Sequence, residues 1–186
     1  MAMKRAITLL ISFLFCITLV AQEKNRHNFE VGIGINMGNI LGAVGGPGRG
    51  LGPGTYFEYR YNLTDKFDIG GQLNYKYSKG SSAYLVDRPT IGLVYNQVGL
   101  KAVADYTGRP NKLVRPYIGV GIGGTMMFTN RTTGTNSTEV FGIVGPRLGL
   151  QIWKFRIALE FDFAFNGQYG FQSTESVGAL NLSFTF

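Results

Sequence analysis

The segment FRIALEFDFAFN, Phe155–Asn166, decides the fold class of this chain. Its odd positions are all aromatic or aliphatic, and its even positions are charged, amide-bearing or alanine. Because side chains of a β-strand point alternately to its two faces, the segment has one apolar face and one polar face. A helix would not separate these residues in this way. The apolar face belongs inside a soluble sandwich or against lipid in a transmembrane barrel, and the rest of the chain favours the barrel.

The same period of two recurs from residue 29 to residue 186 and predicts eight strands in all. They cover residues 29–37, 55–63, 67–77, 90–106, 116–128, 139–152 and 155–166, and the last one ends at residue 186. The connectors after strands one, three, five and seven are long, those after strands two and six are tight, and the one after strand four is intermediate. The long ones are residues 38–54, 78–89, 129–137 and 167–175. Long loops on one side and short turns on the other are typical of outer-membrane barrels.

Two strands break the alternation. Residues 91–95 have the opposite parity to the apolar residues from Val98 onward, so we expect a β-bulge near Asn96 to reverse the phase. The dipeptide Gly145-Pro146 lies within the sixth strand. Because proline cannot donate a hydrogen bond to the ladder, we expect a bulge there or a later start of this strand.

The first 21 residues have the organisation of a secretory signal peptide. Lys4 and Arg5 precede an uncharged, mostly apolar run, Ala6–Val20, and Ala21 supplies the small residue before the cleavage point. We expect cleavage to leave residues 22–186 as a single domain, to remove the one cysteine and to lower the net charge of +7 by two. The mature chain then has no disulfide, and its modest, scattered charge does not favour nucleic-acid binding.

The polar faces of the strands carry nearly balanced charges. An eight-stranded barrel is just wide enough to be filled by side chains, so we expect these charges to form a salt-bridged network in the lumen, with glycines for space. The predicted interior polar network consists of Glu30, Glu58, Arg60, Asp68, Lys76, Lys101, Asp105, Arg147, Arg156, Glu160 and Asp162. Aromatic residues gather where the strands meet the short turns, as they do at membrane interfaces. These residues are Phe29, Tyr61, Phe67, Tyr106, Trp153, Phe155 and Phe186.

The chain ends on the alternating sequence NLSFTF, with Leu182, Phe184 and Phe186 on one face. Together with the export signal and the eight alternating strands, this end resembles the small bacterial outer-membrane β-barrels of the OmpA, OmpX and OmpW type, often grouped as porin-family proteins. The resemblance covers nearly all of residues 29–186. It implies an all-β, eight-stranded antiparallel up-and-down transmembrane β-barrel, monomeric in the outer membrane, with both termini periplasmic. It also implies that Leu182, Phe184 and Phe186 form a signal for the barrel insertion machinery.

Two motifs permit a chemical interpretation and a structural one. Gly119, Gly121 and Gly124 satisfy GxGxxG, but the residues that follow are not helix-like, so we assign the glycines to the lumen face rather than to a dinucleotide site.

Glu160 and Asp162 point to the same face of a strand, and paired carboxylates can perform acid and base chemistry. Inward arginine and lysine partners favour an electrostatic plug instead.

We expect no enzyme activity, cofactor or metal. Lipid-modifying barrels commonly need a histidine with a serine and a carboxylate near the outer rim. His27 is the one histidine and precedes the first strand on the periplasmic side, while Ser173 and Ser176 in the last loop have no histidine beside them. No group of histidine, cysteine and acidic residues has metal-ligand spacing.

The sequence predicts a plugged barrel that acts through its extracellular loops in envelope structure, adhesion or binding. The expected partners are outer-membrane lipid and lipopolysaccharide, because arginine and lysine bind phosphates. The candidate contacts are Arg49, Lys79, Arg88 and Arg131. The alternatives are a narrow channel for small or apolar solutes, a lipid-modifying enzyme, and a soluble carrier with its apolar faces inside.

Overall fold

The computed structural model describes residues 26–37, 48–82, 91–108, 113–131, 136–166 and 170–186, which form nine β-strands. The strands are β1 (His27–Met37), β2 (Gly48–Arg49), β3 (Gly52–Asn62), β4 (Phe67–Ser82), β5 (Ile91–Thr107), β6 (Val114–Arg131), β7 (Ser137–Ile152), β8 (Phe155–Asn166) and β9 (Gly170–Thr185). Within these ranges, no helix has the length and hydropathy needed to cross a membrane.

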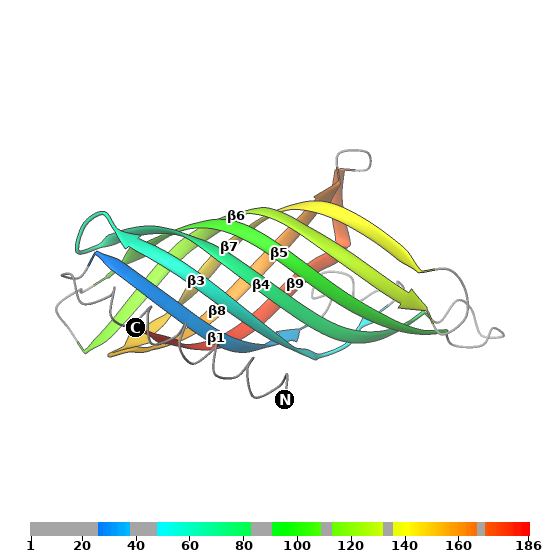
Figure 1. Cartoon of the computed structure of the whole chain (residues 1–186), viewed down its shortest axis with the longest axis horizontal. Helices are drawn as coiled ribbons and strands as arrows, with labels where there is room; N and C mark the ends of the chain where they lie inside the picture. The colour runs from blue at the N-terminus through cyan, green and yellow to red at the C-terminus, as the bar shows by residue number, and fades with distance from the viewer. Residues whose placement is uncertain (1–25, 38–47, 83–90, 109–112, 132–135, 167–169) are drawn as a thin grey trace, which may run out of the picture.

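Eight of the strands close into a ring (Figure 1). Each pairs antiparallel with its neighbours in the order β1-β3-β4-β5-β6-β7-β8-β9, and β9 returns to β1. The short strand β2 pairs with β4 beyond the last pair of β3 and β4, so it continues the line of β3. The predicted eight-stranded antiparallel up-and-down barrel is confirmed.

The barrel has two unlike ends. The turns Leu63–Lys66 and Trp153–Lys154 lie together with the start of β1 and the finish of β9 at one end, here named the turn end. Trp153 has a φ of 55°, a left-handed conformation that residues other than glycine rarely adopt. At the opposite end, named the loop end, strands β4 to β7 continue as long hairpins (Figure 1).

The outer surface of the barrel is apolar. Large aliphatic and aromatic side chains on β1 and on β4 to β9 point outward, and Ile33, Leu100 and Ile122 are 66%, 65% and 62% exposed. Proteins surrounded by water rarely expose an apolar patch of this extent. At the turn end, the rings of Trp153 and Phe155 lie 6.3 Å apart, and a chain of ring contacts continues from Phe155 through Phe184 to Phe186.

Strand β5 is regular where the sequence predicted a bulge. Its pairs with β4 and β6 keep one register throughout, and Asn96 pairs with Tyr77 on one side and with Phe128 on the other. The predicted bulge near Asn96 is wrong. The alternation continues unbroken, so that Leu93 and Tyr95 point inward and are buried. Toward the loop end the inner face of this strand is therefore apolar, as it is in a soluble barrel.

Strand β7 also keeps a single register, so the expected bulge or later start at Gly145-Pro146 is wrong as well. The pairs of Gly145 and Pro146 are missing only from the ladder with β8, and the ladder with β6 is continuous. The real irregularity lies in β9: Asp162 pairs with Val177, but Ala164 pairs with Gln172. Three extra residues of β9 are accommodated at this point.

The strands are longer at the loop end than predicted. Residues 78–82 belong to β4, residues 129–131 to β6, and β9 begins at Gly170 rather than after residue 175. The prediction took polar serine and threonine residues for connectors, but hairpin ladders continue through such residues once the strands have left the apolar belt. The central part of each long connector lies outside the described residues.

Candidate functional site

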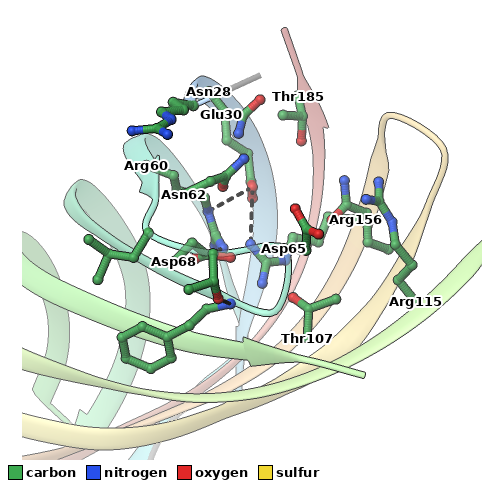
Figure 2. A pocket seen from close by; sticks show the side chains of 15 residues that line it. Asn28, Glu30, Arg60, Asn62, Asp65, Asp68, Thr107, Arg115, Arg156 and Thr185 are labelled. Atoms are coloured by element: carbon green, nitrogen blue, oxygen red, sulfur yellow. Dashed lines mark hydrogen bonds and ion pairs between the residues drawn. The ribbon is translucent and has the colours of Figure 1, made fainter. Parts of the chain in front are cut away.

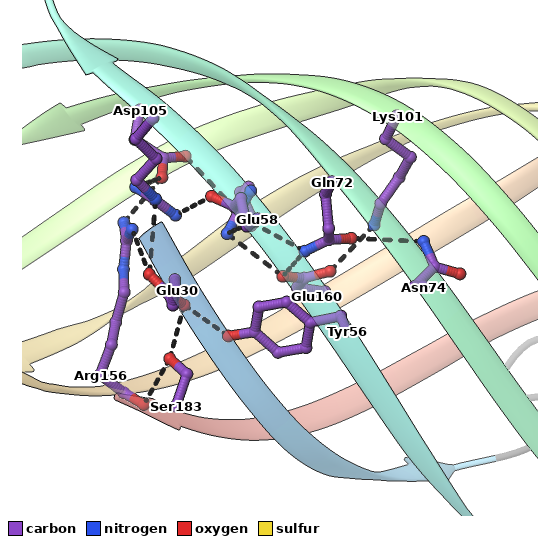
Figure 3. A network of polar contacts seen from close by, with 12 residues as sticks. Glu30, Tyr56, Glu58, Gln72, Asn74, Lys101, Asp105, Arg156, Glu160 and Ser183 are labelled. Atoms are coloured by element: carbon purple, nitrogen blue, oxygen red, sulfur yellow. Dashed lines mark hydrogen bonds and ion pairs between the residues drawn. The ribbon is translucent and has the colours of Figure 1, made fainter. Parts of the chain in front are cut away.

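The lumen holds all eleven residues of the predicted polar network, and we call this set the charge network. Ten of them are buried, and Asp68 is half-buried near the turn end. Strand alternation puts each of these side chains on the inner face of its strand. Hydrogen bonds and ion pairs join them across the barrel (Figure 3). The network is the largest group of buried charged residues in the described part of the chain.

Two arginines and two carboxylates alternate in the part of the network nearest the turn end. Asp105 Oδ2 lies 2.6 Å from Arg60 Nη1 and 2.6 Å from Arg156 Nη2. Glu30 Oε2 lies 3.4 Å from Arg60 Nε and 3.5 Å from Arg156 Nη1. Each guanidinium therefore contacts both carboxylates, an arrangement that offsets part of the desolvation cost of burying them.

Glu30 has further hydrogen-bond partners from two other strands. Its Oε1 accepts hydrogen bonds from the hydroxyl groups of Tyr56 and Ser183, each at 2.5 Å. Arg60 also contacts Glu58 and lies 2.9 Å from Asp68. Hydrogen bonds of this kind to buried carboxylates are the condition under which a buried charge is tolerated.

Arg147 connects the two parts of the network. Its Nη2 lies 3.0 Å from Glu58 Oε2 and 3.3 Å from Glu160 Oε1, and its Nε lies 3.4 Å from Asp105 Oδ1. The amide of Gln72 spans the same gap, donating to Glu58 at 2.9 Å and to Glu160 at 3.2 Å. The lumen is thereby crossed by contacts that join β3, β4, β5, β7 and β8.

Glu160 and Asp162 face two lysines nearer the loop end. Lys101 Nζ lies 2.9 Å from Glu160 and 3.1 Å from Asp162, and Lys76 Nζ lies 2.6 Å from Asp162. Each carboxylate thus has a cation in contact. This arrangement matches the electrostatic plug that the sequence favoured over an acid and base pair.

Glycines make room for the large polar side chains. A Cβ atom at Gly119 would overlap the Asp105 carboxylate, and one at Gly32 would overlap the ring of Tyr56. Gly119 belongs to the GxGxxG match, which lies entirely within the continuous strand β6, and no helix begins after it. The strand lacks the helix amino terminus that a dinucleotide pyrophosphate requires.

A second, apolar group of side chains fills the lumen toward the loop end. We call it the apolar cluster. It consists of Leu93, Tyr95, Met127, Phe141, Ile143 and Ala164. Sequence reasoning missed this cluster because the bulge expected near Asn96 would have turned the apolar residues of β5 outward. The signal was present, since Leu93, Tyr95, Phe141 and Ile143 share the parity of the inward positions on their strands.

A cavity of about 700 Å³ opens at the turn end, and we call it the vestibule (Figure 2). Its charged lining residues are Arg26, Glu30, Arg60, Asp65, Asp68, Arg115 and Arg156. Amides and hydroxyl groups complete much of its wall. They come from Asn28, Asn62, Thr64, Thr107, Gln151 and Thr185. The vestibule is a polar space, and the innermost groups that bound it belong to the charge network.

The other residues singled out from the sequence are dispersed. Leu182 and Phe184 point outward on β9, where they pair with Ile33 and Val31, and Phe184 contacts the ring of Phe186 at 5.1 Å. His27 lies at the turn end, with its Nδ1 2.8 Å from the Tyr59 hydroxyl group.

The four predicted lipopolysaccharide contacts do not all lie in described strands, and the two serines assigned to the last loop lie in a strand. Lys79 and Arg131 are exposed on β4 and β6 at the loop end. Arg49 belongs to β2, and Arg88 lies outside the described residues. Ser173 and Ser176 belong to β9 rather than to a loop. Among the described residues, no group of three histidine, cysteine or acidic side chains is placed to hold a metal.

The closed ring, the exposed apolar belt and the filled lumen define the fold class of small outer-membrane β-barrels. Among solved structures, Neisserial surface protein A (NspA) is similar, with a TM-score of 0.53, 14% identity and coverage of 86% of this chain and 94% of that one. The β-barrel domain of Pseudomonas aeruginosa OprF matches with 17% identity, a TM-score of 0.49 and coverage of 86% and 97%. Ail of Yersinia pestis matches with 15% identity, a TM-score of 0.46 and coverage of 87% and 100%.

These likenesses concern the fold. The resemblance predicted from the alternating strands is thus confirmed at the level of architecture. No family model matches the sequence, and no curated protein does so either.

Proposed function

We propose that this chain is an integral outer-membrane barrel with a plugged lumen, which acts at the cell surface through its loop end and conducts no solute. The observation that carries the proposal is the double filling of the lumen by the charge network and the apolar cluster. Small barrels are filled by their own side chains and need not leave a channel.

The dimensions of the apolar belt support a membrane location. Along β5, the outward positions run from Tyr106 at the turn end to Asn96, whose Oδ1 accepts a hydrogen bond from the Tyr75 hydroxyl group at 2.7 Å. Ten residues at about 3.4 Å each, tilted by roughly 40°, span about 26 Å along the membrane normal. Transmembrane barrels have an apolar band of about 25 Å. In the proposed orientation, the turn end and both termini are periplasmic.

The membrane location can be tested by gel mobility of the membrane fraction in SDS, boiled against unboiled. A closed barrel has its strand edges paired, and we expect it to stay folded in SDS until it is heated. Outer-membrane fractionation together with a heat-dependent shift supports the proposal. A soluble protein without a shift would contradict it and would favour the soluble carrier.

Planar-bilayer conductance tests the plugged lumen. We expect no discrete openings from the purified protein, because Arg147 and its carboxylates cross the path of any solute. As a positive control, Arg147→Ala together with Phe141→Ala removes a large side chain from each filled region. Reproducible openings of the unmodified protein would defeat the proposal and favour the narrow channel.

The proposed partners at the loop end are lipid phosphates of the outer leaflet, including those of lipopolysaccharide. Lys79 and Arg131 are exposed there, and Lys79 lies two pairs above Tyr77 and Asn96 on the outer side of the ladder. Replacing both by glutamine should weaken retention on lipopolysaccharide-containing vesicles. The matched control is Lys66→Gln together with Lys154→Gln at the turn end, which removes the same charge. Equal retention of the two double variants would contradict this partner.

We further propose that the chain is not an enzyme and that Leu182, Phe184 and Phe186 serve the insertion machinery. Among the described residues, His27 contacts a tyrosine and has no serine partner. Altered lipid A on expression, lost on His27→Ala, would revive the lipid-modifying alternative. Phe186→Ala should lower the amount of barrel in the membrane while leaving refolding in detergent unchanged.

A further inference from the structure

Two groups of polar and charged side chains face each other across the vestibule, which Arg26, Glu30 and Arg60 also line. Arg115, Gln151 and Arg156 occupy one row across β6, β7 and β8, where Arg115 pairs with Gln151 and Gln151 pairs with Arg156. Asp65 and Asp68 lie at the turn between β3 and β4. In a ring of eight strands, β3 and β4 lie across the lumen from β7 and β8, so the two groups face each other over the vestibule (Figure 2).

Arg115 has unused hydrogen-bonding capacity. No carboxylate of the described residues forms an ion pair with it, and its Nη2 makes a long hydrogen bond of 3.5 Å to the Trp153 carbonyl oxygen. Gln151 donates to that same oxygen at 3.2 Å. Arg156 also borders the vestibule, but it is buried and its guanidinium is already paired with Glu30 and Asp105. Its guanidinium is held in place by the Tyr117 ring, 3.4 Å from the ring centroid.

These donors suit a carboxylate group. Guanidinium groups bind carboxylates through parallel, charge-assisted hydrogen bonds, and the neighbouring amide adds a further donor. On the facing wall, Asp65 is exposed in the β3–β4 turn, and Asp68 has Arg60 as its partner at 2.9 Å. An ammonium group is the natural ligand for such oxygens. Asn28 lies along the wall and can bond with peptide groups.

We propose that the vestibule binds a short zwitterionic peptide, with its terminal carboxylate on Arg115 and Gln151 and its amino group toward Asp65 and Asp68. The cavity volume of about 700 Å³ lies in the range of small-molecule sites. The ligand enters from the turn end and stops at the charge network. The site therefore differs from the loop end, through which the barrel is proposed to act.

Calorimetric titration of the refolded barrel in detergent micelles tests the site. The probes are trialanine, trialanine with an amidated carboxyl end, N-acetyl-trialanine and inorganic phosphate. We expect trialanine to bind, and either blocked peptide to bind about tenfold more weakly, since each loses one charge-assisted contact. No binding of trialanine, equal binding of the amidated peptide, or phosphate displacing trialanine at equal concentration would overturn the proposal.

Two variants assign the ends of the peptide. Arg115→Gln should weaken trialanine about tenfold and leave the amidated peptide unchanged, and Asp65→Asn should weaken trialanine but not N-acetyl-trialanine. The matched control for Arg115 is Arg131→Gln, which removes the same charge at the opposite end of the barrel. Both arginines lie outside the charge network, and the heat-dependent gel shift checks that each variant is folded. Equal weakening by Arg115→Gln and Arg131→Gln would overturn the site.

Discussion

The two filled regions of the lumen differ in the chemistry that holds them. The charge network occupies the part nearer the turn end and depends on paired ions, with Arg147 in contact with three carboxylates. The apolar cluster occupies the part nearer the loop end and packs rings and aliphatic chains such as Phe141 and Ile143. Where lipid surrounds the barrel, polar residues are left for the inside. We expect the apolar cluster to lie beyond the lipid, where water favours an ordinary apolar core.

The largest expected effect is on the charge network. Arg147→Met should lower the free energy of unfolding by about 4 kcal/mol, because it leaves three buried carboxylates without this cation. Arg147→Lys should recover only part of the loss, since one ammonium cannot reproduce the contacts of a planar guanidinium. Urea unfolding in lipid vesicles measures both, with the exposed Arg131→Met as control. A loss below about 1 kcal/mol for Arg147→Met would contradict the view that paired ions hold the charge network together.

The apolar cluster should respond to volume rather than to charge. Phe141→Ala is expected to cost about 3 kcal/mol through lost burial and a cavity, measured in the same vesicles. Ile143→Leu, which conserves volume, should cost less than about 1.5 kcal/mol. If these two substitutions have equal effects, the loop end of the lumen is loosely packed and the contrast with the charge network fails.

Arginine substitutions along the outer face of β5 should locate the boundary between the two regions. Leu100→Arg is expected to cost about 2–4 kcal/mol, because the side chain faces the middle of the apolar belt. Val94→Arg lies beyond Asn96 and should cost at most about 1 kcal/mol. Unfolding free energies in vesicles distinguish them, and similar costs at both positions would extend the lipid past Asn96.

The smallest expected effect concerns the irregularity of β9. It falls between Asp162 of the charge network and Ala164 of the apolar cluster, and the Ser176 hydroxyl group accepts a hydrogen bond there from the Ala164 amide at 3.3 Å. Ser176→Ala should cost about 1 kcal/mol and speed hydrogen exchange at Ala164. The exposed Thr138→Ala on β7 is the control, expected within about 0.5 kcal/mol. Unchanged exchange at Ala164 would show that the backbone alone maintains this junction.

Period-two alternation was sufficient to predict the ring of strands, because within the belt every outward residue must be apolar. Strand β8 begins and ends at the predicted residues. The rule that apolar residues point outward gave a wrong prediction for β5, because keeping Leu93 and Tyr95 outward required a bulge near Asn96. The strand instead keeps its register past Asn96, and these two side chains turn into the lumen.

The charge network could be predicted as a set of inward residues but not as a set of pairs. Parity places Arg147 in the lumen, yet its contacts with Glu58 and Glu160 depend on the register between strands, which the sequence did not fix. Likewise, Pro146 interrupts only the ladder with β8, and the ladder with β6 continues past it. The vestibule row of Arg115, Gln151 and Arg156 also depends on register, which is why alternation alone did not reveal it.

The contacts that cross the lumen join residues far apart along the chain. Arg147 and Glu58 are separated by 89 residues, Gln72 and Glu160 by 88, and Ser183 and Glu30 by 153. Such contacts form only after long stretches of chain have been ordered, which slows folding. Before β9 reaches β1, the carboxylate of Glu30 lacks its serine partner. Closure of the ring therefore completes the hydrogen bonding of a buried carboxylate as a late event in folding.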